Sequence, residues 1–374
     1  MKSLLLILSA LCTLLAGCSQ ENAEPAPSAE PVQSHGAGLD TSDAEGLLPE
    51  ESGHLKNLRR LTYGGEDAEA YFSPDGKSLV LQSNREGHEF DQIYTMNSDG
   101  TQLVRRSPGP GKTTCAFFSP DGERIVYATT HLEPDAEPET YDPTKGEMWV
   151  LDAAYDVVSC KRDGTDLVRL TDAPGYDAEC AASRTTGQIV FCSMRTGDPE
   201  LFVMNADGSG EKQLTSAKGY DGGPFFSVDG TKIIWRTYCP STPEQEKEYD
   251  DFISRGAVGR WPMDIWIMNA DGSDKQRITT RGEKERRTCW APYLHPDMKT
   301  IVFVSTTMPP GGGRPNFDLH TIDVDGRNLE RITHSPAFDG FPMFSDDGKR
   351  IAFVSSRGAA SRGEVSVYVA DWVP

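Results

Sequence analysis

The sequence predicts an all-β protein, a six-bladed β-propeller closed by its N-terminal strand, on three observations. A hairpin signature recurs six times. Two further short β-rich segments follow most copies, so each repeat holds four strands within about 45–65 residues. The last repeat lacks its fourth strand, and an unassigned strand precedes the first repeat.

The recurring hairpin has the form Phe-Ser-Pro-Asp-Gly. Proline fixes φ at the start of the turn, and glycine takes the positive φ that closes it. An apolar, β-branched segment follows each copy, as expected for a strand. The six copies lie at Phe72–Gly76, Phe118–Gly122, Ala182–Gly187, Phe226–Gly230, Leu294–Met298 and Phe344–Gly348.

The two remaining strands of each repeat also carry a signature. A third strand ends in an Asp-Gly turn, first at Asp99-Gly100, and a fourth ends in a Leu-Thr-like pair, as at Leu170-Thr171. The chain stops after the third strand of the sixth repeat, at 365–372, while residues 58–62 form an isolated Leu-Thr strand. We expect this N-terminal strand to complete the last blade, because pairing removes an exposed sheet edge.

Together, the hairpin, the Asp-Gly turn and the Leu-Thr strand resemble the PD40 (WD40-like) repeats of TolB-like propellers, over residues 54–374. The resemblance implies a TolB-like six-bladed β-propeller. TolB itself carries a small α/β domain before the propeller, a position that here holds a tether. Propeller-bearing serine peptidases have similar blades, but their Gly-x-Ser-x-Gly elbow does not occur in this sequence.

The N-terminus resembles a bacterial lipoprotein signal. Lys2 precedes an apolar segment over Leu4–Leu15, which is too short to span a bilayer, and Leu15-Ala16-Gly17-Cys18 follows. Residues 1–17 are therefore predicted to be a signal peptide, with the lipid anchor on Cys18. By resemblance to Gram-negative sorting, Ser19 in place of aspartate favours the outer membrane, facing the periplasm.

Residues 18–53 are rich in alanine, proline, serine and glutamate and predict a flexible tether before the propeller at 54–374. The formal net charge of the whole chain is -20. This charge argues against nucleic acid as a partner and against adhesion to anionic lipid. We therefore expect a monomer of the cell envelope that meets the membrane only through its lipid anchor.

One set of candidate site residues comes from comparing the repeats. In blades 1, 3 and 6 an aspartate lies six residues before the hairpin serine and an arginine lies twelve residues after it. In a propeller blade both positions fall on the same face, so the two side chains can pair. Two interpretations are open: structural ion pairs within each blade, or a ring of carboxylates that binds calcium or another cation at the channel mouth. The residues are Asp67 with Arg85, Asp177 with Arg195, and Asp339 with Arg357.

Cysteines take these two positions in neighbouring blades, with Cys239 in blade 4 and Cys289 in blade 5. The envelope permits disulfides. They form one if their Cα atoms lie within about 7 Å of one another.

Three long loops between the second and third strands, in blades 2, 4 and 5, form the other candidate site. They leave the same face of the propeller, and such insertions often carry function. We expect Trp149, Tyr249 and Trp261 in or beside a cavity at this mouth. The candidate binding residues are His131, Tyr141, Trp149, Tyr155, Tyr249, Phe252 and Trp261.

The sequence predicts no catalytic residue, no metal ligand set and no cofactor other than the cation considered above. The favoured function is a non-catalytic envelope lipoprotein whose propeller face binds a protein, peptide or glycan. The alternative is a propeller enzyme, a lyase or hydrolase acting on glycans at the channel mouth. An enzyme needs converging acid, base and electrophile, and the sequence offers carboxylates without such a pairing.

Overall fold

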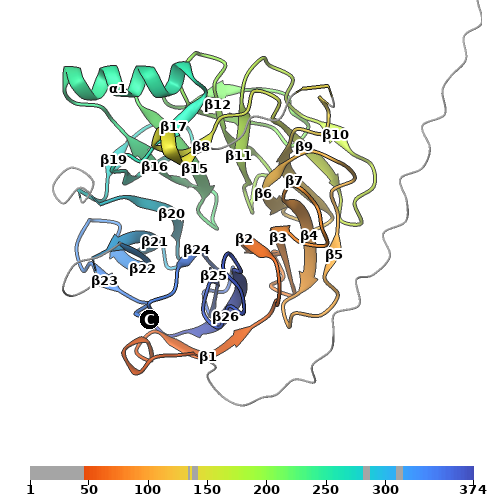
Figure 1. Cartoon of the computed structure of the whole chain (residues 1–374), viewed down its shortest axis with the longest axis vertical. Helices are drawn as coiled ribbons and strands as arrows, with labels where there is room; N and C mark the ends of the chain where they lie inside the picture. The colour runs from red at the N-terminus through yellow and green to blue at the C-terminus, as the bar shows by residue number, and fades with distance from the viewer. Residues whose placement is uncertain (1–45, 134, 137–141, 281–286, 309–314) are drawn as a thin grey trace, which may run out of the picture.

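The structure is a computed structural model that describes residues 46–133, 135–136, 142–280, 287–308 and 315–374. The described residues form six four-stranded antiparallel sheets arranged around a central axis (Figure 1). The predicted six-bladed β-propeller is therefore confirmed. Each blade packs against its two neighbours, and inner strands such as β11 and β15 are buried along their whole length.

The blades follow one another along the chain, and each is given from its inner to its outer strand. Blade 1 holds β2 (Glu66–Phe72), β3 (Ser78–Asn84), β4 (Gln92–Asn97) and β5 (Val104–Arg105). Blade 2 holds β6 (Thr113–Phe118), β7 (Arg124–Thr129), β9 (Asp156–Lys161) and β10 (Val168–Arg169). Blade 3 holds β11 (Asp177–Ala182), β12 (Ile189–Ser193), β13 (Glu200–Met204) and β14 (Lys212–Gln213).

The second half of the ring has the same strand order. Blade 4 holds β15 (Tyr220–Phe226), β16 (Lys232–Tyr238), β18 (Asp264–Asn269) and β19 (Gln276–Arg277). Blade 5 holds β20 (Cys289–Leu294), β21 (Thr300–Thr307), β22 (Asn316–Asp323) and β23 (Glu330–Arg331). Blade 6 holds β24 (Asp339–Phe344), β25 (Arg350–Ser355), β26 (Ser366–Trp372) and, from the N-terminus, β1 (Leu55–Arg60).

The ring is closed by β1, which pairs antiparallel with β26, as predicted. Leu55 and Leu58 of β1 are buried against the last blade. Just before it, a short 3-10 helix, η1 (Pro49–Glu51), falls in the range predicted as tether. Its Glu51 is fully buried and accepts two hydrogen bonds of 2.8 Å from Arg357. These contacts join the segment to the propeller.

The repeated hairpin is held by its serine and aspartate. In blade 1 the Ser73 hydroxyl donates to Asp75 at 2.6 Å, and the same carboxylate oxygen accepts from the Lys77 N–H at 3.0 Å. The same serine-to-aspartate bond forms in the hairpins of Ser119, Ser227 and Ser345. The recurring sequence is therefore turn chemistry.

Each inner strand also contains a β-bulge. In all six blades the pairing of the inner strand with the next strand shifts register between the fifth and the second residue before the hairpin serine, or before the equivalent His295 in blade 5. The residue four before that serine has a positive φ, between 47° and 55°. A bulge re-aims a side chain away from the regular pleat. The six bulge residues are Glu69, Cys115, Glu179, Gly223, Ala291 and Phe341.

The long loops of blades 2 and 4 meet. The blade 2 loop contains η2 (Pro143–Lys145) and β8 (Glu147–Val150), and the blade 4 loop contains α1 (Pro243–Ser254) and β17 (Ala257–Gly259). β8 and β17 pair antiparallel, so a small two-stranded sheet links the two loops (Figure 1). Within the described residues, no helix is long and apolar enough to cross a membrane.

Candidate functional site

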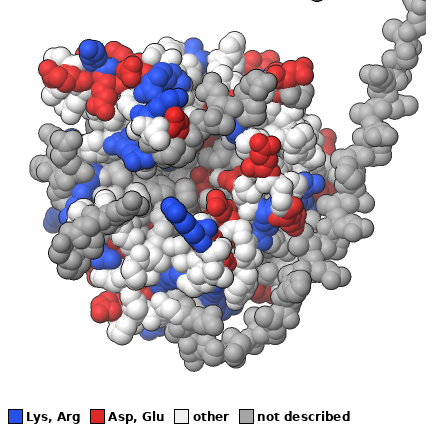
Figure 2. All heavy atoms as spheres, viewed as in Figure 1, with Lys and Arg blue, Asp and Glu red and all other residues white. Residues whose placement is uncertain are grey.

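A cavity of about 770 Å³ opens on the propeller axis, where the bulge residues of all six inner strands line it. The loop strand β8 contributes Met148, Trp149 and Val150 to the wall. Seen as spheres, this face is hollowed at its centre, with charged side chains around the hollow (Figure 2). The bulges therefore bring six sequence-distant positions into one site.

The floor of the cavity is aromatic. Tyr71 and Phe225, two residues beyond the bulges of their strands, stack edge to face with ring centroids 5.3 Å apart. Phe117 and Tyr293 pack against Phe225 at 6.2 and 5.7 Å. Beneath them, the Arg184 guanidinium lies 4.4 Å from the Phe117 centroid. Close packing of this layer separates the cavity from the hairpin face.

The wall on blades 3 and 4 is a hydrogen-bonded ion pair. The Arg236 Nη2 donates to Glu179 at 2.6 Å, and Glu179 also accepts from the Tyr220 hydroxyl at 2.7 Å and from the Gly223 N–H at 2.5 Å. The Arg236 guanidinium lies 4.9 Å from the Trp149 ring centroid. Glu179 is thus almost fully compensated by its neighbours, and Arg236 fixes the orientation of Trp149.

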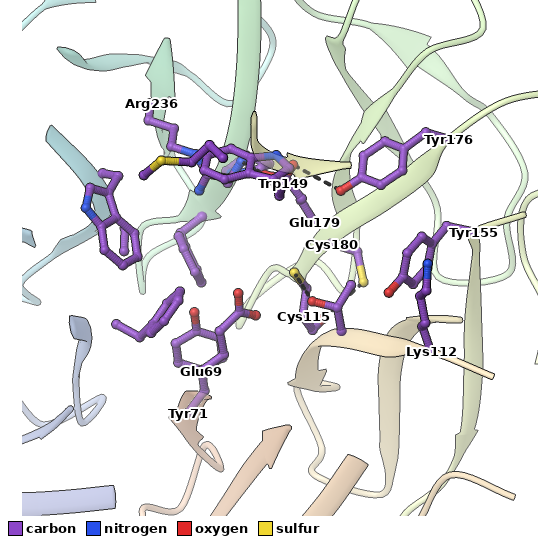
Figure 3. A pocket seen from close by; sticks show the side chains of 18 of the residues that line it. Glu69, Tyr71, Lys112, Cys115, Trp149, Tyr155, Tyr176, Glu179, Cys180 and Arg236 are labelled. Atoms are coloured by element: carbon purple, nitrogen blue, oxygen red, sulfur yellow. Dashed lines mark hydrogen bonds and ion pairs between the residues drawn. The ribbon is translucent and has the colours of Figure 1, made fainter. Parts of the chain in front are cut away.

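The wall on blades 1 and 2 differs because the carboxyl group of Glu69 has no ion-pair partner among the described residues. Glu69 points into the cavity beside Cys115, across from Arg236 and Trp149 (Figure 3). Its Oε2 is buried and has no hydrogen-bond partner among the described residues. Burial raises the pKa of Glu69 to about 7, and the nearby Cys115 thiol and Arg236 charge limit the rise.

The wall on blades 5 and 6 is aromatic. The Trp290 ring packs edge to face on Phe341, with centroids 4.8 Å apart, and on Phe317, with centroids 5.8 Å apart. Phe338 stacks on Trp290 at 6.3 Å. All four side chains are half-buried and line the cavity. The indole Nε1 atoms of Trp290 and Trp149 have no hydrogen-bond partner among the described residues.

The structure brings only some of the predicted loop aromatics to this cavity. Trp149 and Tyr155 line it, and Tyr155 packs on Tyr176. His131 lies instead in a second hollow of about 470 Å³, where burial lowers its pKa. Tyr141 and Cys18 lie outside the described residues.

Tyr249 and Trp261, expected in or beside the cavity at this mouth, do not line it. Both are buried, at 1% and 4% relative exposure, and Phe252 is buried with them. The rings of Tyr238, Tyr249 and Phe252 pack on Trp261 at 4.8, 5.2 and 5.5 Å. These side chains attach helix α1 to blade 4, because an amphipathic helix on a loop must bury its apolar face to form.

All three predicted aspartate-arginine pairs are formed, with N···O distances of 2.5 Å in blade 1, 2.9 Å in blade 3 and 2.8 Å in blade 6. In the other blades the pair joins the third strand to the fourth instead. The pairs there are Asp156 with Arg169, Asp264 with Arg277, and Asp318 with Arg331. Every blade thus holds one such pair, and none of them lines the cavity. The arrangement matches the structural interpretation.

The disulfide considered possible between Cys239 and Cys289 is not formed, and both residues are thiols. The Cys289 Sγ lies 3.5 Å from the Ser305 hydroxyl of its own blade, whereas the Cys239 Sγ lies 3.7 Å from the Thr237 hydroxyl. Each thiol therefore points into its own blade. Among the described residues, no three side chains of histidine, cysteine, aspartate or glutamate converge to hold a metal ion.

The repeat position that forms the site is not the one that carries the aspartates. The cavity is lined by the residues four before the hairpin serine, and not by those six before it. At that position the six repeats carry two glutamates, a cysteine, a glycine, an alanine and a phenylalanine. A repeat position with such varied chemistry is not fixed by the fold, and that variation was the available signal.

Comparison with known proteins supports the fold. A putative TolB from Agrobacterium tumefaciens superposes with a TM-score of 0.52 at 19% identity, covering 85% of this chain and 97% of that one. A TolB homolog of Chlorobium luteolum is 26% identical over 169 residues, 45% of this chain. The fold is a TolB-like propeller. The segment matched in the Chlorobium protein is 31% of that protein's length.

Two other proteins are similar to this chain over most of its length. An uncharacterized protein of Agrobacterium fabrum is 24% identical over 297 residues, 76% of this chain and 82% of that one. An oligogalacturonate lyase from Vibrio parahaemolyticus superposes with a TM-score of 0.50 at 14% identity, covering 86% of this chain and 94% of the lyase. No family model matches the sequence.

Proposed function

We propose that this TolB-like propeller is a non-catalytic binding module of the bacterial cell envelope, which holds its ligand in the axial cavity. The observation that carries the proposal is the cavity itself, about 770 Å³, closed below by aromatic packing and lined by aromatic side chains with a few convergent polar groups. Such a volume and lining are typical of a site for a small ligand. The exposed end of an envelope protein, peptide or glycan is small enough to enter such a site.

The envelope location rests on two observations. The N-terminal segment through Cys18 resembles a lipoprotein signal, and TolB homologues are among the similar proteins. A lipid on Cys18 in the outer membrane and a tether of about 35 residues allow the propeller to reach roughly 30–35 Å into the periplasm. Replacement of Cys18 by serine should release the protein from the membrane fraction, and retention there would contradict the anchor.

The rival function is a glycan lyase, because an oligogalacturonate lyase is similar in fold and a structure of such a lyase contains manganese. The described residues of this chain offer no cluster of three metal ligands. Glu179 and Arg236 in the cavity are hydrogen-bonded to each other rather than arranged around an open position. This arrangement favours binding over lyase chemistry.

The test is a binding screen combined with a search for products. Purified protein should be titrated with a panel of amines, uronides and short peptides, with thermal stability as the readout. Binding should raise the melting temperature of the wild-type protein but not of a Trp149→Ala variant. NMR of the bound compounds should show them unchanged after long incubation. Formation of an unsaturated uronide, with or without added manganese, would identify the lyase instead.

A further inference from the structure

The blades present two different kinds of side chain to the axial cavity. Blades 5 and 6 present aromatic rings, among them Trp290, Phe338 and Phe341, which are half-buried and line the cavity. Blades 1 and 3 present the carboxyl groups of Glu69 and Glu179 at the bulge position. Blade 6 adjoins blade 1 in the ring, so the aromatic wall begins next to the blade of Glu69, whereas Glu179 lies on the opposite side of the axis (Figure 1).

The cations that line the cavity are already paired. Arg236 is bound to Glu179 at 2.6 Å, and Lys112 is bound to Asp152 at 2.7 Å. No ion pair joins Glu69 to a described lysine or arginine within 4.0 Å. The Glu69 carboxyl is therefore the one charge-bearing group of the described lining that is left for a ligand.

A second observation points the same way. The Glu69 Oε2 is buried without a hydrogen-bond donor among the described residues, and its backbone is held at a φ of 53°. An unsatisfied buried acceptor and a left-handed backbone both destabilise a folded protein. A ligand that donates a hydrogen bond to this oxygen would offset the first of these costs. A positively charged donor does so best, because charge-assisted hydrogen bonds are the strongest.

We propose that the cavity binds an organic ammonium ion, with its N–H donated to Glu69 and its apolar or aromatic body packed on Trp290, Phe338 and Phe341. The inference rests on the proposed binding function and names its ligand class. The aromatic rings stabilise such a cation in two ways, by cation-π attraction and by burying the attached carbon skeleton, and the carboxylate lies beside them. An anion of the same shape would be repelled by the negative charge of Glu69.

The test uses three probes of similar shape and different charge: 2-phenylethylamine, 2-phenylethanol and 3-phenylpropionate. Binding to the full mature protein should be measured at pH 8 by calorimetry and by ligand-observed NMR. We expect the ammonium to bind at least about ten-fold more tightly than the alcohol, and the carboxylate to bind most weakly, because one charged hydrogen bond accounts for a difference of this size.

The variant that isolates the charge is Glu69→Gln, which keeps the shape of the side chain. It should weaken binding of the amine about ten-fold or more and leave binding of the alcohol nearly unchanged. The matched control is Glu248→Gln, which neutralises an exposed glutamate of α1 and should change neither. A melting curve confirms that each variant is folded.

The outcomes separate the two proposals. Equal binding of the amine and the alcohol, or amine binding that survives Glu69→Gln in a folded protein, overturns the ammonium assignment and leaves the binding function standing. The same holds if uronides or peptides without a free amine bind and the aryl amine does not. If no compound of the whole panel binds in the cavity, the binding function is itself wrong.

Discussion

The Arg236 guanidinium and the Glu179 carboxylate form a hydrogen-bonded ion pair with an N···O distance of 2.6 Å between blades 3 and 4. The Glu179 side chain is 6% exposed and that of Arg236 is 12% exposed, and the pair is completed by the Tyr220 hydroxyl and the Gly223 N–H. Burial alone would lower the pKa of Arg236, but the Glu179 charge outweighs it and raises this pKa. The pair holds the wall of the cavity and the inner strands β11 and β15 together.

Glu179→Ala should lower the free energy of unfolding by about 3–5 kcal/mol, because it leaves a buried guanidinium without its carboxylate. Urea denaturation followed by tryptophan fluorescence measures the change. Glu211→Ala is the control, because it removes a more exposed carboxylate that also pairs with an arginine. That control should cost about 1 kcal/mol or less. Equal losses in the two variants would contradict the claim that the Arg236–Glu179 pair contributes more to stability than the exposed pair.

Gly223→Ala tests how closely Arg236 approaches the bulge of blade 4. Gly223 has a φ of 55°, and a Cβ there would collide with the guanidinium. Gly87→Ala is the control, since Gly87 has a φ of 76° and open space around its Cα. Both variants carry backbone strain, but only Gly223→Ala should lose about a further 1–3 kcal/mol through overpacking. Equal losses would show that Arg236 moves aside freely.

Glu69→Gln should change how stability depends on pH. The folded-state pKa is raised from 4.5 to about 7, chiefly by burial. The folded protein thus holds a proton that the unfolded chain releases between these values, and wild-type stability falls as the pH rises through this window. Glutamine does not titrate, so the variant should be more stable than wild type at pH 8 by about 3 kcal/mol and nearly equal at pH 4.5. A constant difference would contradict this.

The same titration should control ligand binding, since protonated Glu69 cannot pair with an ammonium ion. Affinity for 2-phenylethylamine should fall as the pH drops below about 7. The charged and titratable groups that act on Glu69 lie on several strands. The Arg236 charge lowers the pKa of Glu69, whereas the carboxyl groups of Glu179 and Asp91 raise it. These groups are Cys115, Arg236, Glu179 and Asp91. Affinity that is independent of pH from 5 to 8 would be evidence against Glu69 as the anchor.

Two tryptophans of the long loops should separate packing from binding. Trp261→Ala removes the centre of the ring cluster under α1 and should cost about 3–5 kcal/mol of unfolding free energy. Trp149→Ala removes a half-buried wall of the cavity and should reduce ligand affinity with a smaller loss of stability. Chemical denaturation and calorimetry on both variants test this. A reversal of the two effects would place the site under α1.

Three chains with different N-termini test closure of the ring. A protein that begins at Gly46 should have the full melting temperature of the propeller. One that begins at His54 lacks Glu51 and leaves Arg357 with Asp339 alone, so it should melt lower. One that begins at Thr62 also lacks β1 and exposes the edge of β26, so it should melt lowest or aggregate. Equal melting temperatures would contradict closure by β1.

The repeats determined the fold from the sequence alone, because turn chemistry is local. Proline, aspartate and glycine act within a few residues, so the hairpins, the four-strand unit and the missing strand supplied by residues 58–62 could all be read without coordinates. The start of α1 also has a local cause, since the Thr242 hydroxyl accepts a hydrogen bond of 3.3 Å from the Gln245 N–H and Pro243 takes the first helical position.

Only the tertiary structure decided which side chains meet on the axis. Glu69, Cys115 and Glu179 are far apart in the sequence and converge because each inner strand bulges at the same place. The sequence likewise did not show which aromatic side chains of the long loops face the cavity. Trp149 faces the cavity and Trp261 is buried under a helix, although both lie in long acidic loops. Pairing between β8 and β17 fixes the position of Trp149. This pairing joins residues about 110 positions apart in the sequence, so no local pattern could predict it.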